Sequence, residues 1–146
     1  MRRPPRVLDT LTYIRELREE RARERFSLAL RALQAALQEL QDLEKAQREY
    51  FQGLAGQRLD GAYLRLLGEG LEATFGERRR LEERLRSRQK EVESLREELA
   101  QAHRERQAAE ILREKRWRAW RREEERRLLR EMDDLTLMRR ARLARP

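Results

Sequence analysis

The segment Gly53-Leu-Ala-Gly-Gln-Arg-Leu-Asp-Gly61 decides how this chain folds, because it separates two long segments that contain neither glycine nor proline. All six glycines lie between Gly53 and Gly76, and the three prolines lie at the chain ends. Glycine and proline are the residues that break helices, glycine through backbone entropy and proline through its missing N–H. Residues 6–52 and 77–145 lack both. This distribution predicts two long helices joined by one turn.

The composition favours helix over disorder, although 44% of the residues are charged and only 38% are hydrophobic. Charge of this density also occurs in disordered segments. The bias here, however, is towards Arg, Glu, Leu, Ala and Gln, which are strong helix formers. Such a composition with a regular apolar period is typical of a coiled coil. We therefore expect a single all-α domain over residues 1–146, without a globular core of normal size.

Apolar residues recur at heptad spacing on both sides of the turn. Before the turn, the two seam positions hold Phe26, Leu33, Leu40, Gln47 and Leu54, and Ala22, Ala29, Ala36, Leu43 and Tyr50. After the turn, the seam holds Leu81, Leu85, Arg88, Val92, Leu95, Leu99, Ala102, Arg106 and Ala109. The first helix is expected to open with the apolar residues Val7, Leu8, Leu11, Ile14 and Leu17.

The expected fold is two long helices in an antiparallel coiled-coil hairpin, with the second helix longer and overhanging. The helices are predicted at about 7–52 and about 62–142, with the turn at about 53–61. A turn centred near residue 57 leaves about 35 residues of the second helix, ~50 Å at the helical rise, without a partner helix. The later glycines also permit a centre nearer residue 65.

Trp117 and Trp120 have two interpretations that depend on the turn centre. They lie three residues apart and so share a helix face. With a centre near residue 65 they would pack on Tyr13 and Leu11 and close the open end of the hairpin. Otherwise they form an exposed anchor for a partner protein, since Trp is enriched at interface hot spots.

Several classes of function are disfavoured by the residues that the chain lacks. It has no cysteine and a single histidine, His103, so neither a disulfide framework nor a His- or Cys-based metal site is expected. His103 is predicted to be a solvated helix residue. No strand–glycine loop–helix pattern suggests a nucleotide site. We expect no enzyme activity, no cofactor and no small-molecule substrate.

The basic residues gather towards the two chain ends. Residues 1–25 carry 8 arginines against 5 acids, and residues 104–146 carry 15 basic against 9 acidic side chains. An antiparallel hairpin would bring both segments to the same end and form a basic pole suited to an acidic protein surface or to nucleic acid. Acidic residues are interleaved throughout the arginines, as in Arg121–Arg127, so nucleic-acid binding is an alternative and not the main prediction.

The location is expected to be cytoplasmic. The N-terminal residues 1–6 are basic but are not followed by the apolar stretch of a secretory signal. No apolar run approaches the ~20 residues that span a bilayer.

Three segments together resemble the FliJ family of the flagellar type III export apparatus. They are Leu8–Ile14 followed by Arg-Glu, then Arg104-Glu-Arg-Gln-Ala-Ala-Glu-Ile-Leu-Arg-Glu-Lys-Arg-Trp117, and finally Glu131-Met-Asp-Asp-Leu-Thr-Leu-Met-Arg-Arg140. The last two resemble the family's "ER-x-A-x-E-x-L-x-E-K" and "ELDE-hydrophobic-x-x-x-R" segments. Asp134 departs from the family pattern, which more often has Glu at that position.

The resemblance implies a non-enzymatic stalk, monomeric or weakly oligomeric. It would enter the pore of the hexameric export ATPase, promote its assembly, couple it to the export gate and escort substrate chaperones at the inner face of the cell membrane. The residues implied to contact the ATPase are Arg2, Arg3, Leu8, Met132, Leu135, Arg139, Arg140 and Arg142. Those implied to contact the gate are Leu67, Leu71 and Arg78. A homo-oligomeric scaffold is a further alternative.

Overall fold

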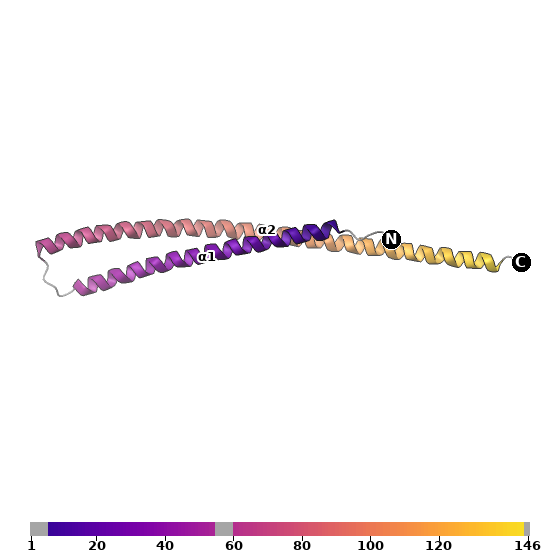
Figure 1. The fold of residues 1–146 in the computed structure, drawn as a ribbon, viewed down its shortest axis with the longest axis horizontal. Coiled ribbons are helices and arrows are strands. Elements are labelled where there is room, and N and C mark those ends of the chain that lie inside the picture. The colour runs from indigo at the N-terminus through magenta and orange to yellow at the C-terminus, as the bar shows by residue number, and fades with distance from the viewer. Residues whose placement is uncertain (1–5, 55–59, 145–146) are drawn as a thin grey trace. The chain divides into compact units, whose positions relative to one another are not determined.

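The computed structural model describes residues 6–54 and 60–144, and these form two helices with no strand among them. Helix α1 spans Val7–Leu54 and helix α2 spans Gly61–Leu143 (Figure 1). The two helices pack against each other, which confirms the predicted all-α helical hairpin. Helix α2 continues without a break through Gly68, Gly70 and Gly76, although each glycine costs about 1 kcal/mol relative to alanine in a helix.

The start of each helix is stabilised by the residue that precedes it. The carbonyl of Arg6 accepts the N–H groups of Asp9 and Thr10 at 3.1 and 3.2 Å. At the start of α2, the N–H of Tyr63 donates to the Asp60 carboxylate at 2.7 Å. Asp60 is therefore the N-cap of α2, since an aspartate at this position satisfies one of the free N–H groups of the first turn.

The chain divides into two compact units. Unit 1 contains residues 1–20 and 101–146, and unit 2 contains residues 21–100. In both units a segment of α1 packs along a segment of α2, so each unit has its own seam between the helices. The two seams differ in chemistry.

The seam of unit 2 is apolar and follows the predicted heptads. On α1, Ala29 and Ala36 are buried, and the larger seam residues Phe26, Leu33, Leu40 and Leu43 are half-buried. On α2, every predicted position from Leu81 to Leu99 is half-buried. Small alanines between large residues let the two helices approach closely. Tyr50 is exposed, and the side chain of Leu54 lies outside the described part of the chain.

In unit 1 the same heptad continues towards the N-terminus, but it holds polar residues. The inward positions of α1 are Leu8, Thr12, Arg15 and Glu19, and Thr12 and Glu19 are among the most buried residues of the structure. Of the apolar residues predicted to open this helix, Leu8 and Leu11 are half-buried, whereas Val7, Ile14 and Leu17 are exposed. The heptad register of the following helix, and not the apolarity of these side chains, decides which face turns inward.

Ion pairs between the helices give the register of the hairpin. Arg78 pairs with Glu44, and Arg84 with Glu39, in unit 2, each at 3.3 Å. In unit 1, Arg15 pairs with Glu105 and Asp9 with Arg113. The midpoint of the residue numbers of each pair falls between 60 and 62. The pairing of the two helices is therefore centred near residue 61, between the predicted alternatives of 57 and 65, and this pairing centre is what we call the turn centre below.

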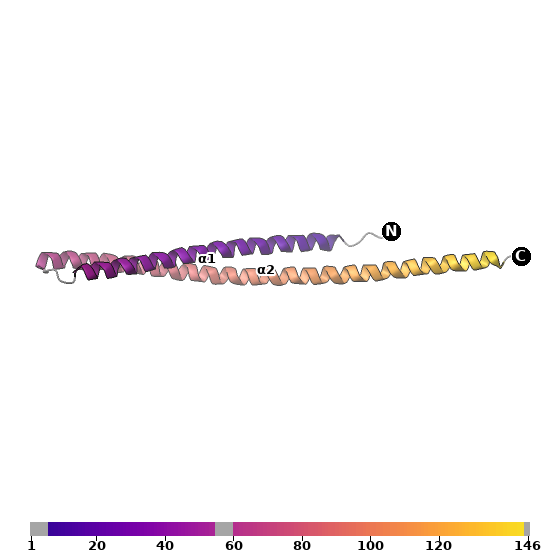
Figure 2. The same cartoon turned by 90° about the horizontal axis from the view of Figure 1, so that it is seen from below.

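This register leaves the end of α2 without a neighbouring segment of α1. The first turn of α1 reaches Arg113 of α2 through Asp9. Both views of unit 1 show the yellow end of α2 extending beyond that turn (Figures 1 and 2). We name residues 117–143 the C-terminal arm, and its length is about 40 Å at 1.5 Å per residue.

Candidate functional site

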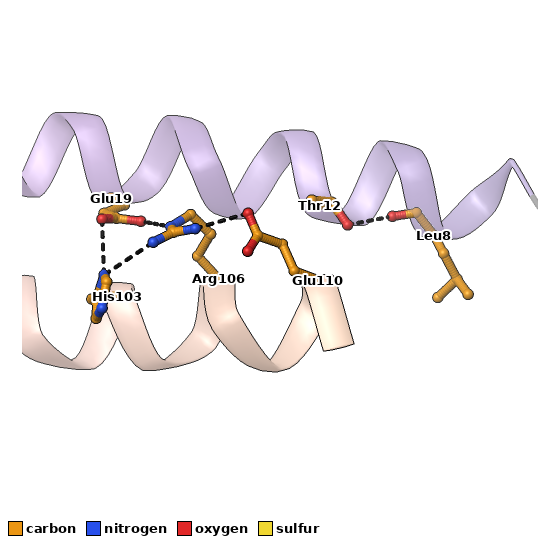
Figure 3. A network of polar contacts seen from close by, with 6 residues as sticks. All are labelled: Leu8, Thr12, Glu19, His103, Arg106 and Glu110. Atoms are coloured by element: carbon orange, nitrogen blue, oxygen red, sulfur yellow. Dashed lines mark hydrogen bonds and ion pairs between the residues drawn. The ribbon is translucent and has the colours of Figure 1, made fainter. Parts of the chain in front are cut away.

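A cluster of charged side chains occupies the seam of unit 1, where a coiled coil ordinarily holds apolar residues. Figure 3 shows Glu19 of α1 directed at Arg106 and His103 of α2. Both Nε of Arg106 and Nδ1 of His103 contact the carboxylate of Glu19, the second at 3.1 Å. Arg106 also donates from Nη1 to Glu110 at 2.8 Å. The Glu19 side chain is only 6% exposed, so these contacts replace most of its hydration.

His103 links the two charged residues of the cluster. Its Nδ1 lies 3.1 Å from Glu19 Oε1 and 3.2 Å from Nη2 of Arg106. With a proton, Nδ1 donates to Glu19; without one, it accepts from Arg106, and it cannot do both at once. His103 is a helix residue with about half of its ring exposed, as predicted, but the ring also faces the seam and contacts Glu19 there, which the sequence did not indicate.

The cluster shifts the pKa values of its two central groups in opposite directions. Burial alone would raise the pKa of Glu19, but hydrogen bonds from His103 and Arg106 and the charge of Arg106 outweigh it. The net effect is a Glu19 pKa below its ordinary 4.5. Hydrogen bonds to Glu110 and Glu19 raise the pKa of Arg106 against the effect of burial. Both side chains therefore stay ionised at neutral pH, as a charge-assisted pair.

The next two inward positions of α1, Thr12 and Arg15, are polar as well. The hydroxyl of Thr12 donates to the Leu8 carbonyl at 2.8 Å, so this buried group is satisfied within its own helix (Figure 3). Arg15 pairs with Glu105 across the seam, and Arg113 Nε lies 2.5 Å from Asp9 Oδ1. Ala102 and Ala109 add only small apolar surfaces on α2. Thr12, Arg15 and Glu19 were not among the residues predicted from the sequence, although extending the heptad from Ala22 backwards leads to all three.

The C-terminal arm presents the second candidate surface. All of its residues from Leu128 onwards are exposed. One face carries a regular series of apolar and basic side chains at spacings of three and four, which we name the arm stripe: Leu128, Met132, Leu135, Arg139 and Arg142. Met132, Leu135, Arg139 and Arg142 also line a shallow groove together with Thr136 and Met138.

The arm stripe contains four of the predicted ATPase-contact residues, and Arg140 lies on another face of the same arm. Leu8 lies elsewhere, half-buried at the first inward position of α1. Arg2 and Arg3 lie outside the described residues. The structure thus brings together the C-terminal members of the predicted set on one exposed helix end.

Trp117 and Trp120 form an aromatic pair at the base of the arm. Their rings meet edge to face, with centroids 5.6 Å apart and planes at 75°. Both are half-buried, and within residues 6–54 and 60–144 neither buried indole N–H has a hydrogen-bond partner. The turn centre near residue 61 places Tyr13 level with about residue 109 and not with the tryptophans, so the predicted packing on Tyr13 does not fit the observed register.

The predicted gate-contact residues lie in the first turns of α2, in unit 2. Leu67 is 8% exposed and presents almost no surface, and the partly exposed Arg78 is held by ion pairs to Glu44 and Glu82. Leu71 is half-buried and lines a mostly apolar groove between the helices, together with Leu43, Ala46, Gln47, Tyr50, Phe51, Gly70 and Thr74. Tyr50 and Phe51 are about half exposed and stack edge to face.

The described residues contain no group of three or more His, Cys, Asp or Glu side chains arranged to hold a metal ion. In the same part of the chain, neither helix has a stretch apolar and long enough to cross a bilayer.

Comparison with known proteins decides the family. The family model described as "Flagellar FliJ protein" matches residues 5–145. The chain belongs to the FliJ family. The match includes both helices and the C-terminal arm, so the resemblance drawn from three segments is confirmed over nearly the whole chain. Neither the search of curated proteins nor that of solved structures gave a match.

Membership in the FliJ family identifies the chain as a component of the flagellar export apparatus. Members of the family are structural components of the export apparatus and are not known as enzymes. The surfaces described above are therefore candidates for contacts with other parts of the export machinery.

Proposed function

We propose that this chain is the stalk of a hexameric export ATPase, with the C-terminal arm as the part that enters the ring. The observation that carries the proposal is the arm stripe, an exposed series of apolar and basic side chains at the end of α2. Met132 and Leu135 are each more than 60% exposed. Apolar side chains that no segment of the described chain covers are typical of a partner-binding surface.

The chemistry of the arm stripe suits a pore lined by acidic and apolar groups. Arg139 and Arg142 follow Met132 and Leu135 on the same face, so apolar contact and charge pairing would act on one surface. Electrostatic attraction of this kind steers association and fixes orientation more than it raises affinity. The stalk would promote assembly of the ring by contacting several of its subunits at once. Arg140, on a neighbouring face, would reach another subunit.

The experiment is to measure ATP hydrolysis by the cognate ATPase with and without the full chain, together with co-elution of the two proteins in gel filtration. The proposal predicts co-elution and a several-fold higher rate of hydrolysis. If the proteins neither co-elute nor change the hydrolysis rate, the stalk proposal is wrong. Light scattering of the chain alone, with a mass near 17.8 kDa, would exclude the scaffold alternative.

A second surface, in unit 2, is proposed for the coupling to the export gate. The groove between Tyr50, Phe51 and Leu71 is mostly apolar and is bordered by two half-exposed aromatic rings. Such a groove can accept an apolar side chain of a partner. Leu67 supports this groove from the interior, and Arg78 holds the helices together beside it, so both would act indirectly.

The variant Phe51→Ser tests the gate proposal. It is expected to weaken binding of the gate's cytoplasmic domain at least tenfold, as loss of a hot-spot aromatic does, and to leave stimulation of the ATPase unchanged. Equal gate binding by the variant and the unaltered chain would contradict it. Two further parts of the proposal rest on family membership. The first is escort of substrate chaperones, for which the Trp117–Trp120 pair is the candidate anchor. The second is placement at the inner face of the membrane.

A further inference from the structure

The seams of unit 1 and unit 2 differ in the side chains that hold α1 against α2. In unit 2 the inward positions of α1 are phenylalanine, leucine and alanine, opposite leucine and valine of α2. In unit 1 the inward positions after Leu8 are Thr12, Arg15 and Glu19. The boundary between the two compact units, at residues 20/21 and 100/101, coincides with this change from polar to apolar.

Polar seams contribute less net stability than apolar ones. Taking a carboxylate and a guanidinium out of water carries a desolvation penalty that their attraction only partly offsets, and an apolar pair of similar volume is often as stable or more stable. Glu19 is 6% exposed and Arg106 is 23% exposed, so both lose much of their hydration. The buried hydroxyl of Thr12 bonds within α1 and adds nothing across the seam.

Besides the half-buried Leu8 and Leu11 and the small alanines of α2, the other contacts of unit 1 are ion pairs that water and salt can reach. The side chains of the Arg15–Glu105 pair are 28% and 36% exposed, and those of the Asp9–Arg113 pair are 38% and 45% exposed. Dissolved salt screens pairs of this exposure much more than it screens buried ones. The attachment of α1 to α2 in unit 1 is therefore sensitive to ionic strength.

We propose that residues 7–20 of α1 form an electrostatic latch, which detaches from residues 101–116 of α2 while the apolar seam of unit 2 stays closed. The latch is closed by Glu19 on Arg106 and His103, with Arg15 and Asp9 as outer contacts. A detached segment loses the packing against α2, and such packing supplies most of the stability of helices in proteins. Opening therefore frays the start of α1 and frees the face of α2 that carries Ala102, Arg106 and Ala109.

An open latch changes what the chain offers to a partner. Arg106 loses Glu19 and keeps Glu110, so a basic group becomes available on a face that also carries two alanines. An acidic helix of another protein could take the place of residues 7–20 there. Salt or such a helix would thus control opening without unfolding the hairpin, in line with the local opening that folded proteins show.

Hydrogen–deuterium exchange of the full chain tests the latch. Peptides from residues 8–20 are compared with peptides from residues 26–43 in 0.05 M and 0.5 M NaCl. We expect exchange of the first set to rise by about threefold or more with salt, because screening weakens the closing ion pairs. Exchange of the second set is expected to stay nearly constant. A salt response that is absent from 8–20, or equal in both segments, overturns the proposal.

Two variants and a matched control separate a latch from general instability. Glu19→Gln is expected to speed exchange in 8–20 and not in 26–43. The double variant Glu19→Leu/Arg106→Leu replaces the central ion pair of the seam by two apolar side chains. It is expected to slow exchange in residues 8–20 and to reduce the response of that exchange to salt. Glu114→Gln removes an ion pair made within α2 and is expected to leave exchange in 8–20 unchanged. Faster exchange in the double variant than in the unaltered chain would contradict the latch.

Discussion

Glu19 and Arg106 show how single residues give this hairpin one register. Each is at an inward heptad position, and each finds its partner only if α1 and α2 are aligned with the turn centre near residue 61. A slip of one heptad would leave a carboxylate buried without its guanidinium, which is strongly destabilising. Polar residues at seam positions are a known means of fixing register in coiled coils.

Replacing Glu19 by glutamine is expected to lower the free energy of unfolding. The change removes the negative charge from a side chain that is 6% exposed and leaves Arg106 without its buried partner. We expect a loss of roughly 1–3 kcal/mol, the range for an unsatisfied buried polar group. Urea unfolding followed by circular dichroism measures it. Glu114→Gln, at an exposed ion pair within α2, is the control and is expected to change stability by less than about 0.5 kcal/mol.

The same residue predicts how stability depends on pH. The pKa of Glu19 in the folded chain lies below its ordinary 4.5, so in acid the unfolded chain takes up this proton first. The contribution of Glu19 is therefore fully present above about pH 4.5 and is lost as the pH falls through the lower folded pKa. The difference in unfolding free energy between the unaltered chain and Glu19→Gln should be large at pH 7 and shrink towards pH 3. An equal difference at both pH values would show that the charge of Glu19 is not what stabilises the seam.

At the scale of the helices, the sequence predicts the apolar seam well and the polar seam poorly. From Ala22 onwards, large and small apolar residues alternate with the heptad, so the inward face of α1 follows directly from the pattern. At the start of α1 the apolar side chains Val7, Ile14 and Leu17 lie on the exposed side. Only the phase of the following heptads indicates that Thr12 and Glu19 face inward. Choosing the inward face by its apolar side chains would select the wrong residues in this part of α1.

The small residues of the unit 2 seam give a test of close helix packing. Ala36 is 4% exposed, and the neighbouring Ala35 is exposed. Ala36→Leu is expected to destabilise the chain by about 1–3 kcal/mol, because extra methylenes in a packed seam force the helices apart. Ala35→Leu adds the same atoms on the outer face and should be close to neutral. Urea unfolding of both variants checks this, and similar midpoints for the two would refute close packing at Ala36.

At the scale of the whole molecule, the glycines of the turn could not fix the register by themselves. They are spread from Gly53 to Gly76, and turn centres from 57 to 65 fit them equally. Ion pairs between side chains distant in sequence select the centre near residue 61. In unit 1 the Asp9–Arg113 pair places the start of α1 beside residue 113 of α2, and the residues of α2 beyond that level form the C-terminal arm.

The functional surfaces could be predicted from sequence only where family resemblance pointed to them. The resemblance placed Met132, Leu135, Arg139 and Arg142 in one predicted site, and the structure brings them onto one exposed stripe. The groove beside Tyr50 is lined by residues of both α1 and α2. The spacing of apolar residues along one helix therefore could not predict it. Leu67, predicted as a contact, is buried because it lies on the inward side of the same segment.

The most direct test of the account is stimulation of the export ATPase by a variant of the arm stripe. Met132→Ser/Leu135→Ser removes two exposed apolar side chains without touching either seam, so the fold should persist by circular dichroism. Leu28→Ser, at 63% exposure on α1 of unit 2, is the matched control. We expect the arm variant to lose most of the stimulation of ATP hydrolysis, about tenfold or more for two hot-spot residues, and Leu28→Ser to retain it. Full stimulation by the arm variant would contradict the claim that the C-terminal arm is the stalk's contact with the ATPase.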